Sequence, residues 1–156
     1  MWWRLSRAEW TKGEGEKNKR ALKKIVLAGQ PPGIVAYDKG VPVGWCALGP
    51  REDYPGLARS RSLKPVDDEP VWSITCFFVN KMYRRLGLSV ALLEAAAQYA
   101  QKKHATILEG YPSVVGKPDV PVPFIWTGTE TAFMRAGFVA VARPTKSRVI
   151  ARRRLR

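Results

Sequence analysis

A short basic segment that contains a glycine carries the clearest chemical signal in this 156-residue sequence. Arg84, Arg85, Gly87 and Ser89 lie between an apolar run and an Ala/Leu-rich stretch. A turn of this kind presents free main-chain N–H groups at the start of a helix, where the helix dipole also favours negative charge. The segment therefore predicts a pyrophosphate site, with Lys81 adding positive charge beside it. An ordinary strand–turn–helix connection, with the glycine serving packing alone, fits the same spacing.

Two strongly patterned elements must position this turn. Residues 71–79 are nearly all apolar and are β-branched or aromatic, which predicts a central strand covered on both faces. Residues 87–103 have high helix propensity. Their C-terminal end carries Lys102 and Lys103, followed by His104, and the helix dipole favours cations there.

Turn, cap and periodicity signals predict the remaining elements. Ser6 and Glu9 have the spacing of a capping box, and so do Thr127 and Glu130. Residues 16–28 predict an amphipathic helix, and a short helix is expected to end at Gly137. The remaining strands are expected at 2–5, 34–37, 41–48, 106–111, 138–142 and 147–155, with a hairpin turn at 38–40 and irregular loops at 49–70 and 112–124. This order predicts one mixed α/β domain covering 1–156, with helices packed on a single sheet.

Charge is the unusual feature of the composition. The chain has 27 Lys and Arg against 13 Asp and Glu, a net charge of +14, and residues 143–156 contain basic but no acidic side chains. Such a surplus attracts phosphates, nucleic acid or acidic partners, although a merely solvated surface has the same composition.

Several classes are excluded by what the sequence lacks. It has no run of about 18 apolar residues and no signal-peptide pattern at its start, so a cytoplasmic protein without a membrane partner is expected. Cys46 and Cys76 have neither disulfide-scaffold nor metal-ligand spacing, and we interpret them as buried thiols.

Residues 77–93 resemble motif A of the GNAT N-acetyltransferase superfamily, an apolar strand and a turn followed by Arg/Gln-x-x-Gly-x-Gly/Ala at a helix start. Arg84 and Gly87 match the first two defining positions, and Ser89 replaces the usual Gly or Ala. The resemblance extends over most of the chain in element order and recurs at 133–138, which is similar to the family's helix ending in Gly-Phe. It implies an α/β fold with a central, mostly antiparallel sheet of six to seven strands flanked by about four helices.

The resemblance implies acetyl-CoA as cosubstrate, no metal, and transfer to a primary amine by direct attack in a ternary complex. In the family the two central strands splay apart to open a slot for the thioester, and one of them pairs with the pantetheine arm. The corresponding backbone here is that of Phe77, Phe78 and Val79, and the pyrophosphate contacts would come from Arg84, Arg85, Leu86, Gly87, Leu88, Ser89 and Val90.

This chemistry needs a base, a donor to the developing oxyanion and a proton for the leaving thiolate. Glu109, in an apolar predicted strand, is the candidate base, although a solvent-facing position or a pair with one of the many arginines fits it as well. Asp67, Asp68 and Glu69 are rival bases or a solvated cluster, and an N–H near Phe78 is the candidate oxyanion donor. Many family members have a Tyr that acts as general acid at the position where this chain has Phe133. Tyr111 or Ser113 could substitute, or the thiolate leaves unassisted.

The acceptor cannot be read from the sequence: an amine-bearing small molecule, a peptide and an aminoacyl-RNA all remain open, as does a homodimer. Tyr54, Trp72, Phe124 and Trp126 could wall an acceptor pocket or anchor loops. Two alternative functions also remain, a non-catalytic acyl-CoA-binding regulator and a nucleic-acid-binding module that uses its basic ends.

Overall fold

The computed structural model describes residues 1–115 and 126–156. Within them, six strands form one sheet in the order β1-β2-β3-β4-β6-β5, in which only β3 and β4 run parallel. The strands are β1 (Gly33–Asp38), β2 (Val41–Pro50), β3 (Trp72–Val79), β4 (Ile107–Gly110), β5 (Val139–Thr145) and β6 (Arg148–Arg154). The described helices are α1 (Arg7–Lys12), α2 (Glu16–Leu27), α3 (Pro55–Arg59), α4 (Leu88–Lys102) and α5 (Glu130–Arg135), with short 3₁₀ turns η1 (Arg51–Asp53) and η2 (Lys81–Tyr83). The mixed α/β fold with a mostly antiparallel sheet is confirmed.

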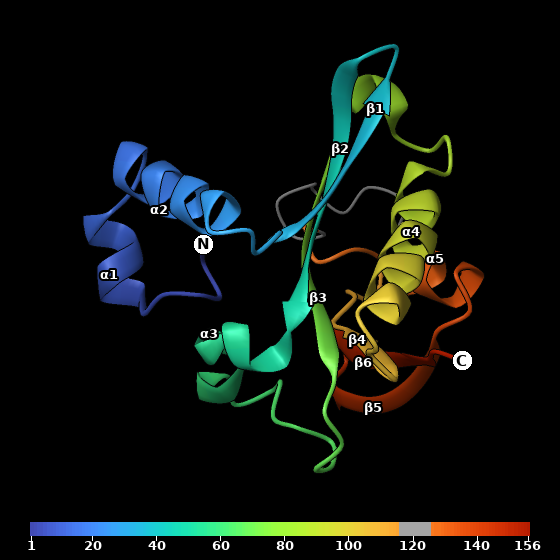
Figure 1. The fold of residues 1–156 in the computed structure, drawn as a ribbon. Helices are drawn as coiled ribbons and strands as arrows, with labels where there is room; N and C mark the ends of the chain where they lie inside the picture. The colour runs from blue at the N-terminus through green and yellow to red at the C-terminus, as the bar shows by residue number, and fades with distance from the viewer. Residues whose placement is uncertain (116–125) are drawn as a thin grey trace.

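The helices divide between the two faces of the sheet (Figure 1). The long helix α4 covers one face together with α5, whereas α1, α2 and α3 lie on the other side. Neither α1 nor α2 contains a buried residue, so these two helices pack loosely.

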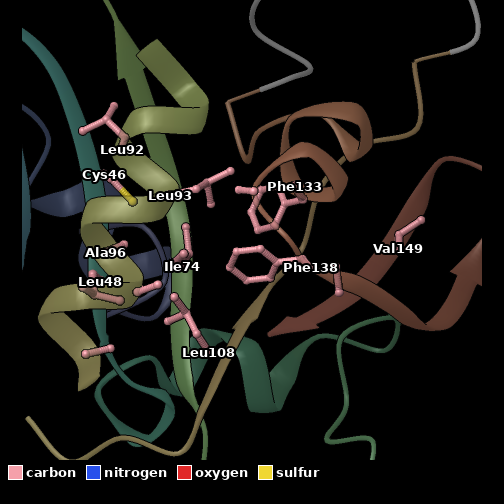
Figure 2. Close-up of a cluster of buried hydrophobic side chains, with 14 residues drawn as sticks. Cys46, Leu48, Ile74, Leu92, Leu93, Ala96, Leu108, Phe133, Phe138 and Val149 are labelled. Carbon is pink, nitrogen blue, oxygen red and sulfur yellow. The ribbon is translucent and has the colours of Figure 1, made fainter. Parts of the chain in front are cut away.

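The main apolar core lies between α4 and the sheet (Figure 2). Leu92, Leu93 and Ala96 of α4 pack against Ile74 of β3 and Leu108 of β4. Their spacing follows the helical period, and this pattern makes α4 predictable from sequence. The same strands turn Ser73 and Glu109 to the opposite face, because side chains alternate along a strand.

Two predictions of local structure are wrong. Residues 2–5 form a turn, not a strand: the amides of Arg4 and Leu5 both donate to the carbonyl of Met1. A four-residue apolar run cannot by itself specify a strand.

The second error concerns the cap of α5. Thr129, not Thr127, caps this helix, with its hydroxyl accepting from the amide of Ala132. The hydroxyl of Thr127 instead accepts from the Arg148 guanidinium. The predicted box around Ser6 and Glu9 is confirmed. The loop expected at 112–124 lies outside the described residues beyond 115.

Candidate active site

The strands β3 and β4 separate in the middle of the sheet, and the chain at Trp126 and Gly128 lies in part of the gap, which we call the slot. The two strands pair only from Trp72↔Leu108 to Ile74↔Gly110, and β3 continues five residues beyond Ile74, to Val79. Along this extension β3 stays paired with β2, as far as Gly44↔Val79. One edge of β3 is therefore separated from β4 over its second half, as the family resemblance implied.

The backbone groups on that edge belong to alternate residues. The amide of Asn80 donates to Val43 in β2, so Phe78 also directs its amide to β2, while Phe77 and Val79 direct theirs to the slot. The amide of Phe77 donates to the carbonyl of Trp126 at 2.7 Å. The oxyanion donor that was predicted near Phe78 therefore corresponds to the amide of its neighbour Phe77, because the Phe78 amide points to β2.

Beyond the end of β3, the predicted cradle has the expected row of unpaired amides. At its borders, the backbone amide of Arg84 donates weakly to the carbonyl of Lys81 (3.4 Å), and the amide of Val90 donates to the carbonyl of Gly87 (2.9 Å). For the five amides of residues 85–89 the described residues supply no backbone acceptor. Arg85 and Gly87 both have positive φ, 63° and 84°. Successive amides in such a conformation form an anion-binding concavity at the helix start.

The surroundings of the cradle are open and basic. A Cβ placed on Gly87 would meet nothing within 4 Å, so a ligand can approach this backbone closely. The side chain of Arg84 folds back onto the carbonyl of Val79, while Lys81 and Arg85 are exposed. These donors fit a doubly charged pyrophosphate.

Glu109 lies in a buried ionic cluster on the sheet face opposite α4. Its Oε1 accepts from Arg51 Nη1 and from the Tyr111 hydroxyl, both at 2.8 Å, and its Oε2 accepts from Arg152 Nε at 2.7 Å. The Glu109 side chain is 1% exposed. These three donors, two of them guanidinium groups, stabilise the charged carboxylate, so it is a poor acceptor for a substrate proton. The role of Glu109 as base stays a prediction.

Tyr111 belongs to the same cluster. Its hydroxyl also lies 2.8 Å from Ser73 Oγ and accepts from Arg51 Nη1. Burial, followed by the nearby negative charge of Glu109, raises the pKa of Tyr111 well above its ordinary value. The phenol therefore stays protonated and is a weak acid. Its assignment as general acid also stays a prediction.

Phe133 is buried and packs edge-on against Phe77 and Phe138. Its ring lies directly on Gly110, where an added Cβ would come within 2.1 Å of it. The ring therefore fills the space beside the slot, but it has no proton to give. Ser113, the other substitute considered, is buried in the segment after β4.

An aromatic cavity of about 100 Å³ lies on the face opposite α4, beside the slot. Thr75 and Cys76 of β3 form part of its wall, and its aromatic lining consists of Trp2, Trp3, Trp45, Tyr54 and Trp126. Of the four aromatic residues proposed from sequence, Tyr54 and Trp126 line it. Trp72 packs instead against Tyr99, and Phe124 lies outside the described residues.

Sequence reasoning missed the contribution of the first residues to this cavity. Trp3 stacks on Trp126 at 6.0 Å, and Trp2 packs edge-on against Trp10. The indole N–H of Trp3 is buried without an acceptor among the described residues. Two adjacent tryptophans in the segment 2–5 were the available signal, because such bulky rings need a partner surface.

The polar groups at this cavity are mostly neutral. Burial raises the pKa of Tyr54 to about 12, and its hydroxyl shares a hydrogen bond with Thr75. Burial also raises the pKa of the Cys76 thiol. The charge of Arg4 is balanced by Asp53 at 3.1 Å. Within the described lining no carboxylate faces the cavity.

Metal-ligand clusters and membrane-spanning helices are both absent from the described part of the chain. It contains no group of three or more His, Cys, Asp or Glu side chains arranged to hold a metal ion. None of its helices is both long and apolar enough to cross a membrane.

Comparison with known proteins agrees with this geometry. Residues 1–113 match the model of the acetyltransferase (GNAT) family, and the chain belongs to that family of acyltransferases. No curated protein matches the sequence.

Solved structures share the fold at low identity. A GNAT-family protein from Desulfovibrio desulfuricans is 18% identical, with a TM-score of 0.57 over 94% of this chain and 88% of its own. The PaiA N-acetyltransferase of Thermoplasma acidophilum, solved with coenzyme A, is 14% identical, with a TM-score of 0.55 over 96% and 80%. A chain of the NatC complex, bound to Gag peptide and CoA, is 13% identical, with a TM-score of 0.56 over 88% and 79%.

Proposed function

We propose that this acyltransferase moves the acetyl group of acetyl-CoA to a primary amine by direct attack in a ternary complex. The observation that carries the proposal is the row of five amides at 85–89, which have no backbone acceptor among residues 1–115 and 126–156 and lie beyond the end of the strand that borders the slot. Family membership and the CoA-bound relatives of the same fold support it.

Binding of the cosubstrate rests on main-chain groups. The amides of the predicted segment 84–90 bind the pyrophosphate, most strongly at 85–89, where no internal acceptor competes. The slot-facing edge of β3 at Phe77 and Val79, beside Phe78, pairs with the pantetheine arm. When bound, acetyl-CoA supplies an activated carbonyl, and the chain positions it.

The Phe77 amide is the proposed donor to the oxygen that becomes negatively charged. In the structure this amide is occupied by the Trp126 carbonyl. The Trp126 carbonyl must therefore withdraw when the thioester enters. Since Trp126 also lines the aromatic cavity, this movement couples entry of the donor to the shape of the acceptor site.

We assign the aromatic cavity to the acceptor amine. It is walled by rings, which attract an ammonium group before it loses its proton. Because no carboxylate of the described lining faces it and the Tyr54 phenol stays protonated, the first proton acceptor is water. Glu109 then acts as a positioning residue, which holds Arg51, Arg152 and Tyr111 beneath the slot.

The test is acceptor-dependent release of CoA thiol. The protein is incubated with acetyl-CoA and separate panels of small amines, peptides and charged tRNA. We expect thiol release with at least one panel and none without acceptor. Protein that binds CoA but releases thiol with no panel would contradict the proposal. It would favour the non-catalytic acyl-CoA-binding alternative, which Phe133 makes plausible.

The cradle has a matched control within the same chain. Gly87 and Gly29 both have positive φ, 84° and 75°, and both face open space. Gly87→Ala strains the cradle backbone and should weaken CoA binding tenfold or more, whereas Gly29→Ala imposes similar strain after α2 and should leave it unchanged. Equal CoA affinity in the two variants, measured by calorimetry, would exclude the cradle.

Glu109→Gln separates a base from a positioning residue. A base is lost at every pH, so the variant would lose the acidic limb of the rate profile. A positioning residue lowers the rate by a constant factor and leaves the profile's shape, since the titrating group lies elsewhere. A full rate at all pH values would exclude both roles.

A further inference from the structure

Trp3 makes a contact in the aromatic cavity that bears directly on the proposed oxyanion donor. Its ring stacks on that of Trp126, with the two centroids 6.0 Å apart and an angle of 25° between the ring planes. Aromatic pairs favour offset arrangements at this separation. The carbonyl of the same Trp126 accepts from the Phe77 amide at 2.7 Å. The side chain of Trp126 is therefore held by Trp3 while its backbone occupies the Phe77 amide.

The backbone of Trp3 is fixed by a close contact with α3. The Gly56 amide donates to the Trp3 carbonyl at 2.8 Å. A Cβ at Gly56 would come within 2.8 Å of this carbonyl oxygen and within 3.0 Å of the Trp3 Cα, so the close approach needs a residue without a side chain. The next residue, Arg4, pairs with Asp53 at 3.1 Å. These contacts determine where the Trp3 ring can lie.

The helices that follow add little to this arrangement. Neither α1 nor α2 contains a buried residue. The neighbouring ring of Trp2 packs edge-on against Trp10 of α1. The position of Trp3 therefore depends mainly on its contacts with α3 and with the Trp126 ring.

The stacked arrangement leaves one polar group unsatisfied. The indole N–H of Trp3 is buried and has no acceptor among the described residues. A buried donor without a partner costs free energy, and this cost is relieved when Trp3 moves and its N–H meets water or a substrate oxygen. The stacking of Trp3 on Trp126 is therefore an arrangement that a ligand can shift.

We propose that Trp3 is a positioning residue, which holds the Trp126 carbonyl on the Phe77 amide and keeps this amide occupied until acetyl-CoA enters. The inference rests on the proposed function, in which the Phe77 amide binds the thioester oxygen. The Trp126 carbonyl and the thioester oxygen compete for one N–H, so a contact that stabilises the first lowers the affinity for the second. Coenzyme A has no thioester oxygen, so its affinity reports only the cradle and the pantetheine arm.

The test compares the affinities of acetyl-CoA and CoA for the full chain, measured by calorimetry. Trp3→Ala removes the stacked ring, and we expect acetyl-CoA to bind about fivefold more tightly, an effect of the size of one hydrogen bond, with less than a twofold change for CoA. Trp3→Phe keeps a ring that can stack and should restore the parent's ratio of affinities. Trp10→Ala is the control: it removes a ring of α1 outside the described cavity lining and should leave the ratio unchanged.

Gly56→Ala disturbs the same contact without removing a ring. The added Cβ displaces the Trp3 backbone, so this variant should change the ratio of affinities in the same direction as Trp3→Ala. Gly56 does not have a positive φ, so alanine adds no backbone strain of its own. Unchanged circular dichroism confirms that each variant folds.

Steady-state kinetics separate positioning from a merely structural role. In Trp3→Ala the KM for acetyl-CoA should fall while the KM for the amine rises, because Trp3 also lines the acceptor cavity. Weaker binding of both acetyl-CoA and CoA would make Trp3 a structural residue, and an unchanged or lowered ratio of affinities would also overturn the inference. A parent protein that binds neither ligand would overturn the proposed function itself, and the inference with it.

Discussion

The two faces of strands β3 and β4 are built from alternate residues of the same short segments, yet they are opposite in character. Toward α4, Ile74 and Leu108 enter an apolar core. Toward the other side, Ser73 and Glu109 enter a hydrogen-bonded ionic cluster with Tyr111. The apolar face is stabilised by many interchangeable contacts, whereas the polar face depends on each partner being present.

This difference has a functional consequence. The α4 face is closed by the helix (Figure 1), which holds the cradle in place. The aromatic cavity lies on the polar side. In the proposed function, apolar packing therefore fixes the donor site, and polar contacts shape the acceptor side. Substitutions on the two faces should therefore differ in how much they lower stability and in which binding step they affect.

The largest effect is expected from Glu109→Ala. It leaves Arg51 and Arg152 facing each other's charge in a buried site, and loss of one partner of a buried ion pair costs about 3–5 kcal/mol of unfolding free energy. Urea unfolding measures the loss. Glu94→Ala, an exposed glutamate on α4, is the control and should change stability by no more than about 0.5 kcal/mol. A loss below about 1 kcal/mol for Glu109→Ala would show that the cluster is solvated.

Leu93→Ala tests the apolar face. Leu93 is fully buried between α4 and the sheet (Figure 2), and its truncation should cost about 3 kcal/mol through lost burial and a residual cavity. The exposed Leu27→Ala serves as control and should be nearly neutral. If the KM for the amine rose in the folded fraction while CoA affinity stayed unchanged, the apolar face would be shaping the acceptor side, and the separation of roles between the faces would fail.

Thr75→Val should have a smaller effect. It keeps the side-chain volume but removes the hydroxyl that shares a hydrogen bond with buried Tyr54, at a cost of about 1 kcal/mol. Its more informative readout is the KM for the amine, which should rise because Thr75 lines the cavity. An unchanged KM together with unchanged stability would remove this hydroxyl from both roles.

The sequence predicts a face of the sheet well when the contacting residues lie close together in the sequence, and poorly when they lie far apart. The apolar face is encoded locally: the helical spacing of Leu92, Leu93 and Ala96 and the apolar run of β3 predict which residues are buried. The cradle is equally local, because a basic turn with Gly87 before a helix determines its backbone.

The polar face is not encoded locally. Arg51 is 58 residues from Glu109 and Arg152 is 43 residues away, so no short-range pattern could indicate that both oxygens of Glu109 are engaged. Occupation of the Phe77 amide by Trp126 is likewise a contact between distant segments. The available signal was the composition: in a chain with this surplus of arginines, a glutamate in an apolar strand is expected to form an ion pair when it is buried.

Asp67 sits at the exposed rim of the polar cluster and should give the smallest effect. Its carboxylate accepts from two nitrogens of Arg152, and this hydrogen bonding lowers its pKa below 3.8. A lowered pKa in the folded state stabilises the fold above pH 3.8, and this stabilisation is lost as the pH falls through the folded-state value.

Asp67→Asn, which cannot ionise, should be slightly less stable than the parent near neutral pH. The difference should close as the pH is lowered below 3.8. Urea midpoints measured across that range test the sign. A difference that widened on acidification would mean that Asp67 is destabilised by the cluster, and that Glu69 and Glu109 alone balance Arg152.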